Sequence, residues 1–196
     1  MPIGSRPAQQ VRWRDVIILD ENNNFFAVQN LSDESLSRGE NRAKLKNAIL
    51  AAATLSDTDI DGIPDRWEFQ NFWGIDSGAT TMTASGNTAL VTYALSQSAV
   101  QYVANQNPVA SLVELEGKRY LNLEFRRRLA GEGERLVYQP QLSTDGVKWS
   151  SDPGIWEELS AVHPWDGSGT EVVTVRTEIA VDASLVMARL QVEAPL

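Results

Sequence analysis

The chain has 196 residues, of which 42% are hydrophobic, enough to bury a core in one large domain or two small ones. Its 17 basic and 26 acidic residues give a net charge of −9, which disfavours binding to nucleic acid or anionic membranes and favours cations as partners. The chain has no cysteine and one histidine, so disulfides, thiol chemistry and multi-histidine metal sites are excluded.

No apolar run is long enough to predict a membrane span, and residues 1–10 lack the apolar stretch of a secretion signal. If the protein is exported, we expect its signal to have been removed already. Any metal site is expected to use oxygen ligands, because the chain has no cysteine thiolate and only one histidine.

An N-terminal region, residues 1–31, contains two runs of β-forming residues, 16–19 and 25–28. The intervening Asp, Glu and three Asn tolerate left-handed backbone, so the pattern predicts a hairpin or a strand with a trailing arm. This arm is far in sequence from the other predicted strands. It either completes a sheet of its own chain or adds to the open edge of a neighbouring subunit, as in donor-strand exchange, which would build a filament. The residues of the predicted donor strand are Val16, Ile17, Ile18 and Leu19.

Residues 32–107 predict a helical region. Leu45, Ile49, Ala52 and Ala53 recur at helical spacing within residues 37–53, which predicts an amphipathic helix. An acidic loop follows, and two shorter helices are predicted at residues 65–73 and 88–95, separated by small residues typical of a loop.

From residue 108 onward the pattern changes to short strands with turn signals between them. The predicted strands are residues 111–117, 119–128, 135–143, 147–150, 170–179 and 185–193. So many short strands in under ninety residues predict an antiparallel, immunoglobulin-like β-sandwich over residues 108–196. The expected fold is therefore mostly β with a helical region: a sandwich preceded by short helices around an EF-hand-like calcium loop.

The loop at residues 57–68, "DTDIDGIPDRWE", concentrates negative charge with a regular spacing. Carboxylates occupy loop positions 1, 3, 5, 9 and 12, and a glycine at position 6 permits a sharp turn. Ca²⁺ takes six to eight oxygen ligands, and this spacing wraps a short chain around one ion, with a backbone carbonyl at position 7 and a bidentate Glu at position 12. The predicted calcium ligands are Asp57, Asp59, Asp61, Ile63, Asp65 and Glu68.

Pro64 occupies position 8 of the loop, where paired EF-hands form a short β-bridge through a backbone N–H that proline lacks. Proline instead suits the start of the following helix. We therefore interpret the loop as solitary and static.

The spacing resembles the D-x-D-x-D-G-x-x-D-x-W-E calcium loops, related to dockerin and thrombospondin type 3 loops, of secreted and cell-surface bacterial proteins. In that group a second loop and helix and then a β-sandwich often follow, and residues 84–96 and 120–192 resemble these parts. The second region lacks acidic ligands, and Thr92 stands where the closing Glu would be. The resemblance implies one Ca²⁺ ion, an extracellular or cell-surface location and a mostly non-enzymatic, rigid architecture.

Other residues allow alternative interpretations. The chain has six tryptophans, which either stack on sugar rings or pack: Trp67 and Trp73 on the loop helix and Trp149 in the sandwich core, with Trp156 and Trp165 in a long loop. His163 has Asp166 and Ser168 close by, but no catalytic motif surrounds them. Possible glycan attachment points are Asn30, in an Asn-Leu-Ser sequence, and the hydroxyl-rich loop 77–88.

The leading hypothesis is a non-enzymatic extracellular structural protein, a calcium-stabilised subunit of a surface fibre or pilus-like filament. In this hypothesis the chain associates with copies of itself into a homopolymer. It binds no nucleic acid and has no membrane span. The alternative is a calcium-stabilised carbohydrate-binding or anchoring module of a larger secreted protein.

Overall fold

The computed structural model describes residues 11–53, 57–103, 106–129, 136–152, 154–179 and 185–194. The fold is mostly β, with few helices and antiparallel sheets. The chain divides into two compact units, unit 1 (Met1–Thr81) and unit 2 (Met82–Leu196). This division runs through the predicted helical region 32–107. Residues 1–10 of the predicted N-terminal arm lie outside the described part of the chain.

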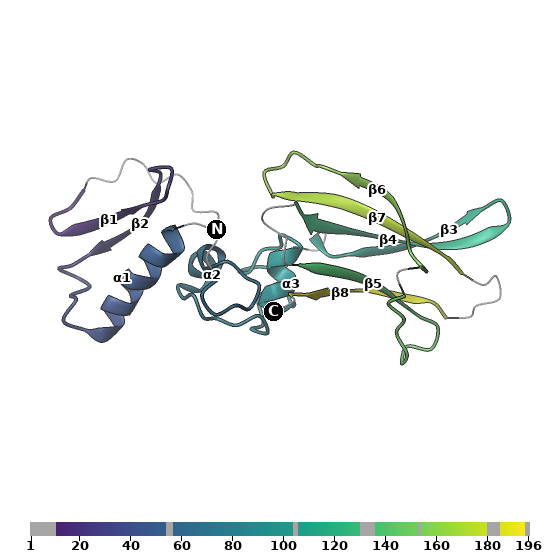
Figure 1. Ribbon diagram of the computed structural model, residues 1–196, viewed down its shortest axis with the longest axis horizontal. Coiled ribbons are helices and arrows are strands. Elements are labelled where there is room, and N and C mark those ends of the chain that lie inside the picture. Colours follow the sequence, from purple (N-terminus) through teal and green to yellow (C-terminus); the bar gives the residue numbers. More distant parts are fainter. Residues whose placement is uncertain are drawn as a thin grey trace. The chain divides into compact units, whose positions relative to one another are not determined.

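Unit 1 begins with a β-hairpin of β1 (Asp15–Leu19) and β2 (Phe25–Asn30) (Figure 1). Its turn uses Asn23 in left-handed backbone, with φ 62°, as the Asn-rich turn sequence predicts. The predicted donor strand thus pairs within its own chain. Its two faces differ, because Ile18 is 7% exposed, whereas Ile17 and Leu19 are about half exposed.

Helix α1 (Gly39–Ala52) packs its alanine face against this hairpin. The core cluster joins Ala48, Ala51 and Ala52 to Ile18, Phe69 and Ile75. The sequence pattern placed Ile49 on the buried face, but Ile49 is 52% exposed. Ala48 and Ala52, spaced four residues apart, form the contact stripe instead, since small side chains allow a helix to approach a sheet closely.

Two short helices flank the boundary between the units. Helix α2 (Asp65–Phe72) belongs to unit 1, and helix α3 (Ala89–Ala94) belongs to unit 2. Thr88 caps α3 by accepting a hydrogen bond from the Val91 amide. Both helices start within one residue of the predicted positions.

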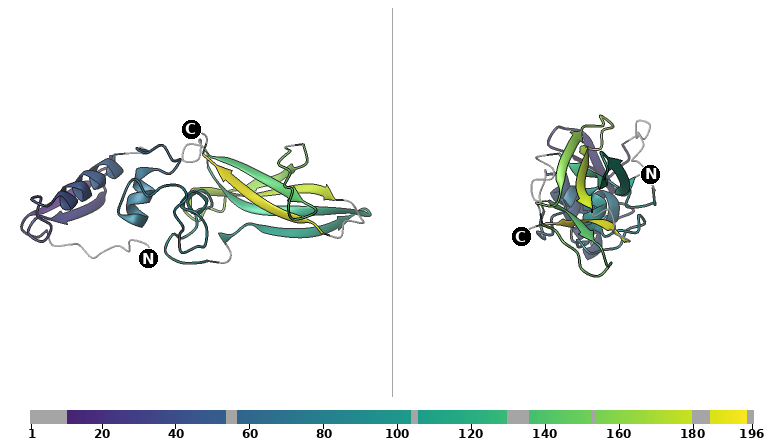
Figure 2. Two further views of the ribbon diagram at one scale, coloured as in Figure 1. Left: turned by 90° about the horizontal axis from the view of Figure 1, so that it is seen from below. Right: turned by 90° about the vertical axis from the view of Figure 1, so that its right-hand side faces the viewer.

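Unit 2 contains a four-stranded antiparallel sheet in the order β3-β4-β7-β6 and a two-stranded sheet of β5 and β8. Their bounds are β3 Val109–Leu115, β4 Lys118–Arg128, β5 Val137–Ser143, β6 Glu157–Val162, β7 Thr170–Ile179 and β8 Met187–Glu193. Figures 1 and 2 show the β5–β8 pair alongside one face of the larger sheet. Between them lies a core of Leu123, Phe125, Val173 and Val175, against which Tyr138, Trp156, Ala188 and Leu190 pack.

One strand prediction is wrong, and one strand was not predicted. Residues 147–150 form a single bridge, from Ser150 to Leu142, rather than a strand. Strand β6 was missed because all six of its residues are exposed, which leaves no alternation of buried and exposed positions for a sequence pattern to reveal. The tryptophans also differ from expectation, since Trp156 rather than Trp149 packs on the core, and Trp149 lies beneath the Arg189 guanidinium, 4.3 Å from the ring centroid.

Helix α3 is bound to the strands of unit 2 by two side chains. The Tyr138 hydroxyl donates to the Ala94 carbonyl at 3.0 Å and accepts from the Arg128 amide at 3.0 Å. Arg128 Nε donates to the Tyr93 carbonyl at 2.9 Å, and its guanidinium lies over the Tyr93 ring. These contacts add side-chain donors to two carbonyls at the C-terminal end of the helix. Within the described residues, no helix is long and apolar enough to cross a membrane.

Candidate metal centre

Three predicted ligands converge in the acidic loop, residues 57–68. Ligand oxygens of Asp57, Asp59 and Asp61 all lie within 4.8 Å of one another. The loop folds around the first of these side chains, because Asp57 accepts hydrogen bonds from the amides of Asp61, at 3.1 Å, and Gly62, at 2.9 Å. Backbone donors thus curl the chain so that its carboxylates face a common point.

Two residues allow this sharp path. Gly62 has φ 90°, a conformation that glycine adopts without steric cost. Ile60 has φ 59°, which is unfavourable for a β-branched side chain, and it is 57% exposed. The loop therefore holds some backbone strain next to its acidic cluster.

The other predicted ligands occupy distinct places. Asp65 is fully buried, and its two oxygens accept from the amide and the hydroxyl of Thr58, both at 2.7 Å. Ile63 is also fully buried, and its amide donates to Asp61 Oδ1 at 2.9 Å. Asp65 and Ile63 thus close the loop on itself. Pro64 immediately precedes α2, where its missing N–H costs no helical hydrogen bond.

Glu68 is the most unusual residue of the site. Its side chain is fully buried, and one oxygen accepts from the Ser77 amide at 2.7 Å. The other oxygen, Oε2, is buried and has no hydrogen-bond partner, and the same is true of Asp61 Oδ2. Carboxylate oxygens buried without a donor are costly unless a proton or a cation neutralises them.

Electrostatics support the same conclusion. Burial, and then the charges of Asp59, Asp61 and Asp65, raise the pKa of Glu68 from its ordinary 4.5 to about 8, although the Ser77 amide acts in the opposite direction. Burial also raises the pKa of Asp61. A cation among these groups would reverse these shifts, because it stabilises the ionised carboxylates.

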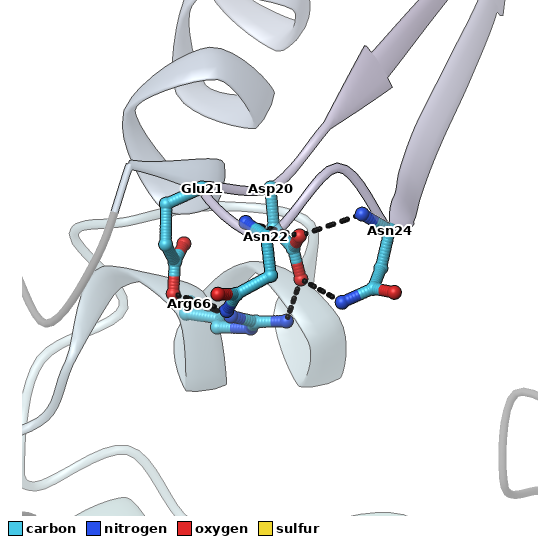
Figure 3. Close-up of polar contacts among 5 residues, drawn as sticks. All are labelled: Asp20, Glu21, Asn22, Asn24 and Arg66. Atoms are coloured by element: carbon cyan, nitrogen blue, oxygen red, sulfur yellow. Dashed lines mark hydrogen bonds and ion pairs between the residues drawn. The ribbon is translucent and has the colours of Figure 1, made fainter.

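The helix that carries Glu68 is fastened to the hairpin turn (Figure 3). Asp20 is buried, and its carboxylate accepts from Arg66 Nη2 at 3.2 Å as well as from the amides of Asn22 and Asn24. Arg66 also lies 3.9 Å from Glu21, the other acid of the turn. The acidic loop, α2 and the hairpin are therefore linked within unit 1.

Sequence reasoning missed the residues that support the ligands. Thr58 orients Asp65, Ser77 binds Glu68, and Arg66 ties the site to Asp20. Thr58 and Ser77 act largely through local turns whose small polar residues carry no specific spacing. Arg66 and Asp20 lie 46 residues apart, so only the tertiary structure brings them together.

The remaining candidate residues make local contacts within their own units. His163 accepts a hydrogen bond from the Trp165 amide at its Nδ1, and Asp166 forms an ion pair with Arg126 at 2.8 Å. The Asn30 side-chain nitrogen, where a glycan would attach, donates to Asp15 at 2.7 Å and to the Trp13 carbonyl. Attachment of a sugar there would displace at least one of these bonds.

Comparison of the chain with protein-family models, with curated proteins and with solved structures found no match. The chemistry of the site therefore rests on its own geometry. Its donor set is all oxygen, is mostly anionic and includes two buried oxygens without donors, which fits a hard, oxygen-binding cation better than metals that prefer nitrogen or sulfur.

The raised pKa of Glu68 predicts an unusual pH dependence in calcium-free buffer. The folded state keeps its proton up to about pH 8, whereas the unfolded chain releases it near pH 4.5. Protonation of Glu68 therefore stabilises the fold fully below about pH 4.5, and this contribution is lost as the pH rises to about 8. Thermal unfolding with a chelator should show a midpoint that falls between pH 5 and pH 8.

The variant Glu68→Gln should lack this part of the pH dependence, because its amide resembles the protonated acid and does not titrate. His163→Asn, which removes the one histidine of the chain, serves as the control and should retain it. A midpoint of the unsubstituted protein that is constant from pH 5 to pH 8 would contradict the prediction.

Proposed function

We propose that the chain is a calcium-stabilised, non-enzymatic structural protein of the cell surface or extracellular space. The observation that carries this proposal is the fully buried Glu68, whose unpartnered oxygen lies in the field of three neighbouring aspartates. An acid in this environment is stable only when protonated or bound to a cation. Extracellular calcium modules bind at about 10⁻⁴–10⁻³ M, a range that suits a structural ion rather than an intracellular signal.

One Ca²⁺ ion would be held by Asp57, Asp59, Asp61, the Ile63 carbonyl and Glu68. Asp65, whose oxygens already accept from Thr58, would contribute a remaining lone pair or hold a ligating water. The ion would supply charge neutralisation, and the chain would supply a loop already curled by backbone hydrogen bonds. The structural role is to fix α2, and through Arg66 the hairpin turn, in one arrangement.

The strands of unit 2 support an immunoglobulin-like β-sandwich in this proposal. The core of Leu123, Phe125, Val173 and Val175 separates the four-stranded sheet from the β5–β8 pair, and side chains of both sheets meet there. Such sandwiches are common in surface proteins as rigid spacers and adhesion modules. This part of the proposal concerns architecture and assigns no ligand.

Calcium should raise the stability of unit 1. With free calcium tenfold above the dissociation constant, linkage predicts about 1.4 kcal/mol, or an increase of roughly 5–10 °C in the unfolding midpoint of a unit of this size. Glu68→Gln should abolish the increase, because it removes the charge and one of the two bidentate oxygens. Thermal unfolding followed by tryptophan fluorescence, with calcium and with a chelator, measures the effect.

The matched control is Glu40→Gln, which removes the same charge from an exposed position in unit 1. It should leave the calcium response intact. An unsubstituted protein whose midpoint is the same in calcium and in chelator would refute the calcium proposal. Magnesium at the same concentration should have a weaker effect, since it demands stricter octahedral geometry.

Assembly into a surface fibre is the larger-scale part of the proposal. The hairpin is a two-stranded sheet, so each of its strands has one edge outside the β1–β2 ladder, and the half-exposed Ile17 and Leu19 make β1 hydrophobic. The edge strand β3 also exposes Val109 and Leu112. Exposed apolar edges are common sites of strand addition between chains.

Charge on β1 should block such assembly. The double variant I17K/L19K places lysines on the half-exposed face without altering the buried Ile18, so unit 1 should still fold and respond to calcium. Electron microscopy and sedimentation should show fibres for the unsubstituted protein and for the control Val11→Lys, which alters an exposed residue outside the strand. Fibres formed equally well by I17K/L19K would exclude β1 as the assembly strand.

A carbohydrate-binding module is the second candidate, and one feature favours it. Trp73 is 67% exposed and borders a hollow of about 360 Å³ that is lined mainly by apolar side chains and also by Lys44 and Gln70. An aromatic face beside polar groups is a suitable surface for a sugar ring. Glycan-array binding that is lost in Trp73→Ala but kept in Trp165→Ala would favour this function, and absence of binding would exclude it.

A further inference from the structure

The acidic loop has a structural counterpart 24 residues later in the chain, at residues 81–92. Gly62 has φ 90°, and Gly86, at the equivalent position, has φ 87°. The equivalence extends along both segments, through the first residues of the helices and two buried positions. The matching pairs are Asp65 and Ala89, which begin α2 and α3; Glu68 and Thr92, both 0% exposed; and Phe69 and Tyr93, 4% and 3% exposed.

The chemistry of the second loop is different in a systematic way. Each carboxylate at positions 1, 3, 5 and 12 of the acidic loop is replaced by a hydroxyl. The replacements are Thr81 for Asp57, Thr83 for Asp59, Ser85 for Asp61 and Thr92 for Glu68. We call residues 81–92 the hydroxyl loop.

Three of these hydroxyls contact one another directly. Thr83 Oγ1 lies 2.7 Å from Ser85 Oγ and 2.8 Å from Thr92 Oγ1, and Ser85 Oγ lies 3.0 Å from Thr92 Oγ1. Ser85 is 6% exposed and Thr92 is 0% exposed. These three contacts form a triangle of hydroxyls that joins the loop to α3, and the Thr83 hydroxyl also lies 3.1 Å from the Asn87 carbonyl, to which it can donate.

A hydroxyl both donates and accepts, so neutral hydroxyls bind one another without any added group. Ionised carboxylates only accept, so the acidic loop needs a cation or a proton to join the same positions. The hydroxyl triangle thus makes the cross-link that an ion would make at the equivalent place in the acidic loop.

Side-chain amides connect the hydroxyl loop to the chain that follows α3 in unit 2. Asn87 donates to Gln97 at 2.8 Å, and Gln97 donates to the Gln106 carbonyl at 3.1 Å and to Asn107 at 3.0 Å. Helix α3 is in turn bound to the strands through Tyr138 and Arg128. The loop is therefore part of the hydrogen-bonded framework that carries the strands.

We propose that the hydroxyl loop is an ion-free structural copy of the acidic loop, and that the calcium dependence of this protein is confined to unit 1. The second half of this statement rests on the proposed calcium function. Loss of calcium would then loosen the hairpin and α2 of unit 1, while unit 2 keeps its strands and α3. Of the two equivalent loops, only the acidic loop would then bind calcium.

Hydrogen exchange of the full chain, followed by mass spectrometry, tests the proposal. Removal of calcium should lower protection within residues 57–77 by about tenfold, the factor that corresponds to 1.4 kcal/mol, and should leave residues 83–103 unchanged. Loss of protection at residues 83–103 on chelation would overturn the confinement to unit 1. Unchanged protection at residues 57–77 would refute the calcium function and leave the copy to be tested by the variants below.

The triple variant T83D/S85D/T92E restores carboxylates to the hydroxyl loop. It should bind a second Ca²⁺ ion, raising the stoichiometry measured by calorimetry from one to two, and should make protection of residues 83–103 depend on calcium. A triple variant that folds but gains no calcium dependence would overturn the equivalence of the two loops.

Thr92→Val keeps the proposal testable if the triple variant fails to fold. Valine has the shape of threonine without its hydroxyl, so it removes one corner of the triangle. Protection at residues 83–103 should fall by the same factor with and without calcium, whereas the control Thr144→Val, at an exposed position of unit 2, should change nothing. An effect of Thr92→Val that calcium reverses, or no effect at all, would overturn the role of the triangle.

Discussion

The organisation of unit 1 depends on the burial of one carboxylate among others. Glu68 is inaccessible to water, one of its oxygens has no donor, and Asp59, Asp61 and Asp65 contribute unfavourable charge. Burying an acid in this way is unfavourable unless its charge is neutralised, so the unit is held either by a proton on Glu68 or by a cation. Under the proposed calcium function, the pH response and the calcium response of unit 1 would both follow from this burial.

That constraint reaches the hairpin through a single helix. Glu68 and Arg66 lie on α2, and Arg66 binds the buried Asp20 at the hairpin turn. The same helix contributes Phe69 to the core that joins β1 and α1. Neutralisation of the acidic loop therefore favours the packing of α2 against β1 and α1. Helix α2 in turn stabilises the hairpin turn through the Arg66–Asp20 ion pair. In the proposed fibre, the strand that would meet a neighbour is the one supported by this chain of contacts.

The acidic loop and the hydroxyl loop are closed onto their helices by different kinds of side chain. Both need a glycine with positive φ, a helix start and a fully buried side chain that closes the loop. In the proposal, the carboxylates make the closure of the acidic loop depend on a cation or a proton, whereas the triangle of Thr83, Ser85 and Thr92 needs neither. The stability of unit 1 would then respond to calcium, and that of unit 2 would not.

The sequence alone determined the features that depend on local spacing. Carboxylates at every second residue and Gly62 predicted a convergent acidic loop, because a short turn brings such positions together. The period of the apolar residues predicted the first helix, and local residue types and turn signals predicted the two shorter helices and most strands. Only the tertiary structure decided which groups are buried. The Asp20–Arg66 pair, the unpartnered oxygen of Glu68 and the hydroxyl triangle depend on contacts whose cost or benefit is set by removal from water. Strand β6, whose residues are all exposed, escaped prediction for the same reason, since its pairing with β7 leaves no alternation of buried and exposed side chains.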